Sequence, residues 1–315
     1  MKTGAFIVPT GIGASIGGFA GDAGKWARRL SQKCKLIVNP NVVNAACFSA
    51  INDNMLYVEG YSLDKFFQGK CSLIEAESNK IGVIFDKEIP QDVLNVHINT
   101  INAVKTVYDI DIPFYEITDE NVGVEFFVDK SGASMGNIKN LNTLKIAAEK
   151  LLNKGANAIA LVCRFPEEQG DNYAQGIGVD PVGGVEAILS HYISKEFGIP
   201  CAHAPAFDDY TIHSEIVDSR CSAEYITPTF LPCILLGLNN APLIQAAKTG
   251  LTIDDLDFLA LPYNALGGIP AIEANERGVP IYAVRENVSV LNVTPEIFSI
   301  NCHVIGTYQE LIDII

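Results

Sequence analysis

The segment Cys201-Ala-His203-Ala-Pro205 places a thiol and an imidazole two residues apart, after a predicted strand over residues 199–202. Side chains at this spacing in an extended chain point to the same face of a sheet. A thiol and an imidazole on one face can act as nucleophile and general base, or as two metal ligands. The alternative is a buried thiol beside a hydrogen-bonded histidine. Because no further carboxylate or histidine stands at ligand spacing, we predict no metal site.

Two more side chains are candidates for catalysis. Glu59 stands between apolar residues and a glycine in Tyr57-Val-Glu-Gly60. Burial of a carboxyl group there raises its pKa toward the range of a general acid or base. Ser134 lies in a glycine-rich segment and supplies a hydroxyl. We therefore predict His203 and Glu59 as acid/base residues, with Ser134 or Cys201 as nucleophile.

Two glycine-serine segments are nearly identical, G-A-S-I-G at Gly13–Gly17 and G-A-S-M-G at Gly132–Gly136. Two others echo each other, G-G-V-E-A-I at Gly183–Ile188 and G-G-I-P-A-I at Gly267–Ile272. In each, an extended run leads into glycines and then into a helical pattern. Glycines at a helix N-terminus expose N–H groups that attract phosphate or carboxylate. We predict that the two G-A-S segments face each other and hold one anionic ligand; tight turns chosen for close packing are the alternative.

The predicted ligand contacts come from these segments, with one cation and one acid added. Arg164 follows a predicted strand over residues 156–163 and can pair bidentately with a carboxylate or phosphate, or form a surface ion pair. Asp180 precedes Pro181 at a predicted helix start, where capping is the alternative role. The predicted substrate-binding residues are Thr10, Gly11, Gly13, Ser15, Gly17, Ser131, Gly132, Gly136, Arg164, Asp180, Gly183, Gly184, Gly267 and Gly268.

The first glycine segment departs from both common nucleotide signatures. Gly11 to Gly17 reads G-x-G-x-x-x-G, which is one residue longer than the dinucleotide fingerprint. Asn39 and Asn41 stand where an acidic ribose partner is expected. The P-loop pattern fails as well, because the glycine spacing up to Lys25 is too long and Trp26 replaces the required Ser or Thr. The cofactor therefore stays unknown, with an NAD(P)-dependent oxidoreductase as an alternative.

Short apolar strands alternate with helices along the chain. Strands are predicted at 5–9, 35–38, 80–85, 112–117, 123–128, 156–163, 199–202, 256–261 and 280–284, and helices at 16–30, 91–108, 141–153, 182–197, 230–238, 269–277 and 308–315. This alternation is typical of mostly parallel sheets with helices on both faces. At roughly 150 residues per domain, the length predicts two lobes.

The sequence thus predicts an α/β protein with two Rossmann-like lobes around a cleft. The boundary is placed at a polar turn over residues 118–122, which precedes a restart of the pattern. The predicted lobes are residues 1–122 and 123–315, and one continuous domain is the alternative.

The amino-acid composition disfavours several classes of binding partner. Of the 315 residues, 48% are hydrophobic and 19% are charged, as in a folded globular protein. The net charge of −15 disfavours nucleic acid. The eight cysteines form no C-x-x-C pair, no apolar run reaches the 18 or so residues of a membrane span, and the N-terminal apolar run is too short for a secretory signal. We expect a cytoplasmic protein with reduced thiols and no membrane partner; a homo-oligomer stays open.

Five stretches resemble the bacterial family known as domain of unknown function 3326. They are Val8–Ala23, Tyr57–Asp64, Gly178–Ile188, Cys201–Pro205 and Thr229–Cys233. The resemblance runs along nearly the whole chain and implies a full-length member of a single family. It implies no reaction and no catalytic residue.

These observations predict a small-molecule enzyme that binds an anionic metabolite, a carboxylate or a phosphate, through glycine-rich helix N-termini. Lyase, isomerase or hydrolase chemistry is the expected reaction class. One alternative is a non-catalytic protein that binds a metabolite or docks on a biosynthetic partner, and the other is the oxidoreductase named above.

Overall fold

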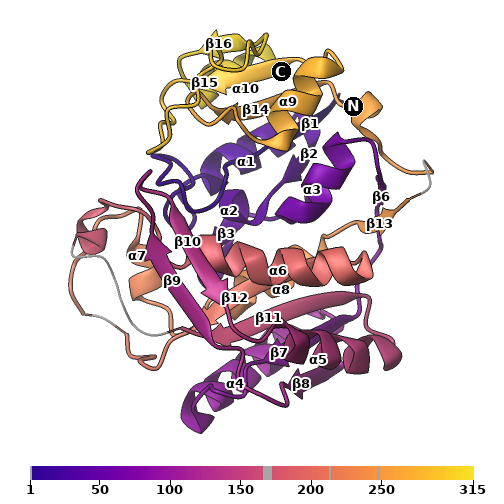
Figure 1. Ribbon diagram of the computed structural model, residues 1–315, viewed down its shortest axis with the longest axis vertical. Helices are drawn as coiled ribbons and strands as arrows, with labels where there is room; N and C mark the ends of the chain where they lie inside the picture. The colour runs from indigo at the N-terminus through magenta and orange to yellow at the C-terminus, as the bar shows by residue number, and fades with distance from the viewer. Residues whose placement is uncertain (1, 166–171, 213, 247–248) are drawn as a thin grey trace.

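Two parallel sheets form the framework of the protein (Figure 1). The computed structural model describes residues 2–165, 172–212, 214–246 and 249–315. One sheet has six strands in the order β16-β15-β14-β1-β2-β5, and the other has four in the order β12-β11-β7-β8. All strand pairs within these two sheets are parallel, and helices flank both sheets. The predicted α/β class, with parallel sheets and helices on both faces, is confirmed, and the two sheets fit the predicted Rossmann-like lobes.

The six-stranded sheet takes its strands from both ends of the chain. They are β1 (Lys2–Phe6), β2 (Cys34–Val38), β5 (Met55–Tyr57), β14 (Phe258–Pro262), β15 (Ile281–Val284) and β16 (His303–Ile305). Its helices are α1 (Gly24–Ser31), α2 (Pro40–Val43), α3 (Gly60–Phe67), α9 (Ile269–Glu276) and α10 (Tyr308–Ile314). Alternate residues of β1 face opposite ways: Phe6 packs with the side chains of α1 and α10, whereas Ala5 packs with those of α3 and α9.

The four-stranded sheet is built from the middle of the chain. Its strands are β7 (Ile81–Phe85), β8 (Phe114–Ile117), β11 (Ala158–Arg164) and β12 (Cys201–Ala206). One face packs on α4 (Gln91–Tyr108) and α8 (Leu231–Asn239), and the other on α5 (Leu141–Asn153) and α6 (Gly183–Phe197). The short helix α7 (Ser222–Tyr225) and the single turn η1 (Tyr173–Gln175) lie in the connections around this sheet.

Three short antiparallel strand pairs and a turn complete the fold of the described residues. The hairpin of β9 (Val124–Val128) and β10 (Ser134–Ile138) packs on α6. The pair β6 (Ser72–Ile74) and β13 (Leu243–Gln245) joins the two segments that connect the sheets, and β3 (Asn44–Ala45) pairs with β4 (Phe48–Ser49). A turn, η2 (Ile253–Asp255), precedes β14. The predicted boundary after residue 122 falls between β8 and β9; it stays a prediction, because strand pairing describes layers rather than independently folding units.

Two sequence-based predictions about local structure are wrong. The helix predicted from residue 16 begins only at Gly24, because Gly17 and Gly21 have φ of 87° and 86°, in the left-handed region that ends a helix. The second glycine-serine segment is predicted to lead into a helix, but Ser134 is the first residue of strand β10. The helix predicted at 141–153 is separate from it and has the bounds of α5.

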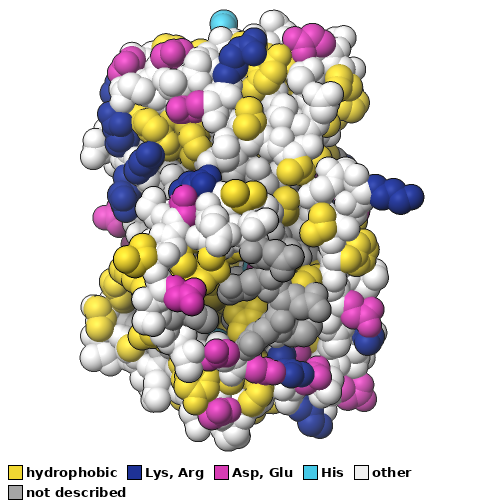
Figure 2. Space-filling view, turned by 90° about the vertical axis from the view of Figure 1, so that its left-hand side faces the viewer, with side chains coloured by type: hydrophobic (Ala, Val, Ile, Leu, Met, Phe, Trp, Pro, Cys, Tyr) yellow, Lys and Arg dark blue, Asp and Glu magenta, His cyan; other side chains and the backbone are white. Residues whose placement is uncertain are grey.

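Surface and membrane features can be stated for the described residues. On the face drawn in Figure 2, Lys and Arg side chains gather along one edge of the half that contains the six-stranded sheet. Among the described helices, none combines the length and the apolar character needed to cross a lipid bilayer. All eight cysteines are unpaired.

Candidate functional site

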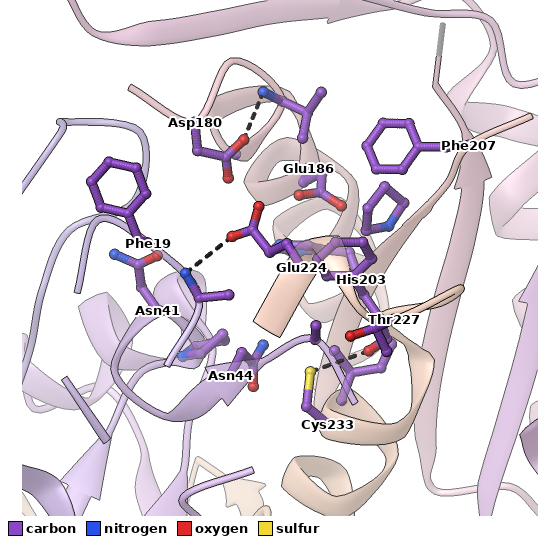
Figure 3. A pocket seen from close by; sticks show the side chains of 18 of the residues that line it. Phe19, Asn41, Asn44, Asp180, Glu186, His203, Phe207, Glu224, Thr227 and Cys233 are labelled. Atoms are coloured by element: carbon purple, nitrogen blue, oxygen red, sulfur yellow. Dashed lines mark hydrogen bonds between the residues drawn. The ribbon is translucent and has the colours of Figure 1, made fainter. Parts of the chain in front are cut away.

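A cavity of about 410 Å³ lies between the loops that follow β1 and β2 and the elements α6, β12 and α7 (Figure 3). The first wall contains Thr10, Gly18–Ala20, Asn41 and Asn44, from the six-stranded sheet. The second wall contains Asp180, Glu186, His203 and Glu224, together with Tyr173 and Phe207. The loops leave the carboxyl ends of parallel strands, which is where open α/β sheets bind ligands.

Three carboxyl groups from three separate elements converge on the second wall. Glu186, in the first turn of α6, is 6% exposed, and its Oε1 has no hydrogen-bond partner. Asp180, in the loop before α6, accepts a hydrogen bond from Val182 N at 3.0 Å. Glu224, in α7, accepts from Ala20 N and from the Tyr173 hydroxyl, each at 3.0 Å.

Burial and mutual repulsion disfavour the charged forms of these acids. Burial, followed by the neighbouring carboxyl groups of Asp180 and Glu224, raises the pKa of Glu186 well above its usual range. Burial, followed by Asp180, raises the pKa of Glu224 to about 8. The pKa of Asp180 is raised by burial as well. Burial and the neighbouring carboxyl groups therefore favour the protonated forms of Glu186 and Glu224.

His203 lines the cavity from β12, and its imidazole is held by α6. Its Nδ1 lies 2.9 Å from Ser190 Oγ, and that hydroxyl donates to Ala187 O at 3.3 Å. Because the hydroxyl proton is used in that bond, we assign the Nδ1 proton to the histidine, which leaves Nε2 as an acceptor. Burial, followed by His191, lowers the pKa of His203 to about 3. The imidazole is thus neutral, suited to hydrogen-bonding a ligand more than to taking a proton from it.

The second G-A-S segment contacts Gly11, two residues before the first segment, and the N–H groups of both segments bind the protein. Ser134 N donates to Gly11 O at 2.8 Å. In the first segment, the amides of Ser15, Ile16 and Gly17 donate to Val288 O, Asn287 Oδ1 and Asp22 Oδ1. In the second, the amides of Gly132 and Ala133 both donate to Asp129. These N–H groups therefore have protein partners and do not line the cavity.

The serines of the two segments have the same role. Ser15 Oγ donates to Glu286 O and accepts from Val288 N, each at 2.9 Å. Ser134 Oγ donates to Pro181 O at 2.8 Å and accepts from Gly184 N at 2.9 Å. Each hydroxyl thus joins its segment to a distant stretch of backbone. The predicted nucleophile Ser134 is 4% exposed and does not line the cavity.

The glycine pair at the start of α6 allows close packing. A Cβ on Gly184 would lie 2.0 Å from Ser134 O, and one on Gly183 would lie 2.9 Å from the carboxylate of Asp180. Gly183 lines the cavity. The other pair, Gly267 and Gly268, precedes α9 and does not line it, and a Cβ on Gly268 would meet only Pro270, at 3.6 Å.

The other predicted catalytic residues lie outside the cavity. Glu59 caps α3, accepting from Tyr61 N at 2.9 Å and Ser62 N at 2.6 Å; burial raises its pKa to about 6. Cys201 packs in the core against α6, on the face from which His203 reaches Ser190, so the predicted shared face is confirmed. Burial raises the pKa of the Cys201 thiol well above its usual range, which keeps it protonated.

The remaining predicted ligand contacts are used within the protein. Arg164 makes a bidentate pair with Asp208, at 2.8 and 2.6 Å, and a second ion pair with Glu88 at 3.1 Å. Ser131 donates through its amide and its hydroxyl to Asp129. Of all the residues predicted from sequence, Thr10, Asp180, Gly183 and His203 line the cavity.

Sequence reasoning missed Glu186 and Glu224. A signal for Glu186 was present, because it stands three residues after Gly183, and residues at this spacing share one face of a helix. Glu224 had no such signal, since α7 has four residues and its place depends on tertiary packing. Among the described residues, no group of three or more His, Cys, Asp or Glu side chains is arranged to hold a metal ion.

The fold and the cavity define an α/β protein with two parallel sheets and an acid-lined pocket between them. Residues 3–315 match the family described as Protein of unknown function (DUF3326), and the chain belongs to that family. The chain is also 37% identical, over 319 aligned positions, to an uncharacterized lipoprotein of Synechococcus sp., covering 98% of this chain and 89% of the relative. No solved structure matches the chain.

Proposed function

We propose that the protein is an enzyme that binds a small polar metabolite in the cavity between the sheets and acts on it by proton transfer. The observation that carries this proposal is Glu186: a carboxyl group that is buried, lines a cavity and leaves Oε1 without a partner. An unsatisfied buried acceptor costs about 1–3 kcal/mol, so such a group is rarely kept without a use. A volume of about 410 Å³ suits a small molecule.

The cavity also holds groups suited to acid–base chemistry. Glu224 has a pKa of about 8, close to the pH at which enzymes work, so it can both give and take a proton. Hydrogen bonds from Ala20 N and the Tyr173 hydroxyl fix its position. His203, neutral and held by Ser190, presents Nε2 as a hydrogen-bond acceptor. In this proposal Glu224 transfers the proton and His203 orients the reacting group, in a lyase, isomerase or hydrolase reaction.

An anionic ligand held by the glycine segments stays a sequence-based prediction. The amides that motivated it at residues 15–17 and 132–133 donate to protein oxygens in this structure. The enzyme proposal therefore does not depend on them.

Hydrogen exchange tests the proton-transfer step even while the substrate is unidentified. The protein is incubated in D₂O with a library of small metabolites, and mass spectrometry with proton NMR records deuterium incorporation and new products. We expect one compound class to exchange or react with the wild-type protein, and Glu224→Gln to abolish the effect. A compound that binds the cavity tightly but is neither exchanged nor converted would favour the non-catalytic binding protein instead.

The cellular location is part of the same proposal. We propose a cytoplasmic protein, which the eight unpaired cysteines support, because thiols stay reduced in the cytosol. The Synechococcus relative is named a lipoprotein, and membrane attachment of this chain is therefore the alternative. Cell fractionation distinguishes the two: we expect the protein in the soluble fraction, and recovery in membranes that only detergent releases would contradict a cytoplasmic location.

A further inference from the structure

We propose that the ligand carries an organic cation, an ammonium or guanidinium group, which occupies the space between Glu186, Asp180 and Glu224. This inference rests on the proposed small-molecule site and names the chemistry of its ligand. It stands on two independent features of the cavity: the uncompensated carboxyl groups, and the hydrogen-bond acceptors that have no donor.

The carboxyl groups of Asp180, Glu186 and Glu224 line the cavity together. No Lys or Arg stands among the described residues that line it. Arg220 lies close by, but its guanidinium pairs with Asp218 and Gly176 O and lies over the ring of Phe19. Carboxyl groups crowded in this way ionise readily only when a positive charge enters among them.

The unpaired polar atoms require a donor. Two buried side-chain atoms of the described cavity lining lack a hydrogen-bond partner, Glu186 Oε1 on one wall and Asn44 Oδ1 on the other. The amide of Asn44 is oriented by the bond from its Nδ2 to the Tyr57 hydroxyl, at 3.2 Å, which leaves the carbonyl oxygen as the unpaired atom. A ligand with several N–H groups, such as an amine or a guanidine, can donate to acceptors of this kind.

Aromatic side chains fit the organic part of such a ligand. The rings of Phe19 and Tyr173 lie 5.0 Å apart, and those of Phe207 and Phe230 lie 6.2 Å apart, edge to face. All four residues line the cavity. Aromatic faces attract cations and also cover apolar carbon chains. A bare metal ion would use neither property, and the described side chains form no metal-ligating group.

Binding of three four-carbon probes tests the charge preference. Calorimetry and thermal shift compare putrescine, a diamine, with 1,4-butanediol and with succinate, and agmatine adds a guanidinium group. We expect putrescine or agmatine to bind at least about 10-fold more tightly than the diol, a difference of about 1.4 kcal/mol. Glu186→Gln, which keeps the shape and removes the charge, is expected to weaken amine binding by about 10-fold or more.

Glu196→Gln is the matched control, because Glu196 lies on α6 outside the cavity and pairs with Lys145. Its amine affinity should equal that of the wild-type protein. If Glu186→Gln fails to fold, as judged by circular dichroism, Glu224→Gln takes its place with the same expected loss. Equal losses in the cavity variant and the control would overturn the proposal. So would tighter binding of succinate than of both amines, or no amine binding at about 20 mM, where even a millimolar ligand stabilises measurably.

The two proposals fail in different ways. A bound amine that is never converted, and whose carbon-bound hydrogens are never exchanged in D₂O, leaves the cation site standing and removes the enzyme. Turnover of a carboxylate or phosphate that has no cationic group leaves the enzyme standing and removes the cation site.

Discussion

The two walls of the cavity differ in their ionisable side chains. On the side of the six-stranded sheet the described lining has none; it consists of Thr10, Asn41, Asn44 and small or apolar residues. The opposite side supplies the carboxyl groups of Asp180, Glu186 and Glu224 and the imidazole of His203. The first wall is made of loops that follow β1 and β2, and the second of α6, β12, α7 and the connections between them. One wall therefore contributes shape and fixed dipoles, while the other carries the ionisable groups.

Substitutions on the two walls should differ most clearly in their effect on turnover. Once a substrate is found, we expect Glu224→Gln to lower kcat by about 10²–10⁴-fold, the usual contribution of a general acid or base. Asn44→Ala, on the opposite wall, should raise KM and leave kcat within about threefold, because it removes a contact made equally in the ground and transition states. Steady-state kinetics of both variants gives kcat and KM. An equal fall in kcat in the two variants would show that the two walls do not have separate roles in catalysis and binding.

Close packing should also differ between the two glycine pairs. Gly184→Ser places a side chain against Ser134 O, where a Cβ would lie 2.0 Å away, and we expect a loss of about 1–3 kcal/mol of unfolding free energy. Gly268→Ser is the matched change at the N-cap of α9, where the space is open and serine is a favoured cap, so stability should hold or rise. Denaturant titration of both variants compares them; a larger loss at Gly268 would contradict the packing argument.

The two bridging serines offer a finer comparison. Ser134→Ala leaves Gly184 N and Pro181 O without their partner in a buried place, and we expect a cost of about 1–3 kcal/mol. Ser15 is half-buried, so water can replace part of what Ser15→Ala removes, and about 1 kcal/mol is expected. Urea unfolding midpoints, at constant m-value, give the change in unfolding free energy for each variant. Equal costs would show that the difference in burial between Ser15 and Ser134 does not change how much each hydroxyl stabilises the protein.

Stability should also depend on pH, because Glu224 has a raised pKa. The folded-state pKa of Glu224, about 8, lies above its unfolded value, so the folded protein holds a proton that the unfolded chain has lost. Stability therefore falls as pH rises from about 4.5 to about 8. Asp22, which follows β1, has a pKa raised to about 6, chiefly by burial, so its contribution is lost at lower pH than that of Glu224.

Melting temperatures of the empty protein resolve the two acids. We expect Tm to fall between pH 6.5 and 8.5, and Glu224→Gln to reduce that fall. Asp22→Asn should instead alter the slope below about pH 6.5. A Tm that rises with pH in the upper range would contradict the raised pKa of Glu224.

Regular elements were predictable where local patterns decide the structure. The helices predicted at 91–108 and 141–153 have the observed bounds of α4 and α5, because each carries an apolar stripe at helical spacing. The helix predicted from residue 16 failed because its apolar spacing was sound but Gly17 and Gly21 take left-handed φ values, which spacing does not reveal. Local pattern and backbone conformation are separate pieces of information, and only the first is visible in an apolar repeat.

The site was predictable only in part. His203 and Asp180 follow from their positions at a strand and before a helix, and both line the cavity. The amides of the glycine segments bind protein oxygens, and their partners, such as Asn287 and Asp129, are set by the tertiary structure or the local turn and not by the glycine pattern. Glu224 reaches the cavity from a helix of four residues. So short a helix shows no periodic apolar pattern, so the sequence could not predict the position of Glu224.

The position of β1 has a consequence for how the chain is made. This strand lies between β2 and β14, so one of its neighbours is only about 30 residues away and the other is more than 250 residues away. The middle segment, which forms the four-stranded sheet, leaves the ribosome complete before β14 exists. During synthesis one edge of β1 therefore stays unpaired until β14 has been made. A chaperone or an early-folded middle lobe that covers this edge would protect the nascent chain from aggregation.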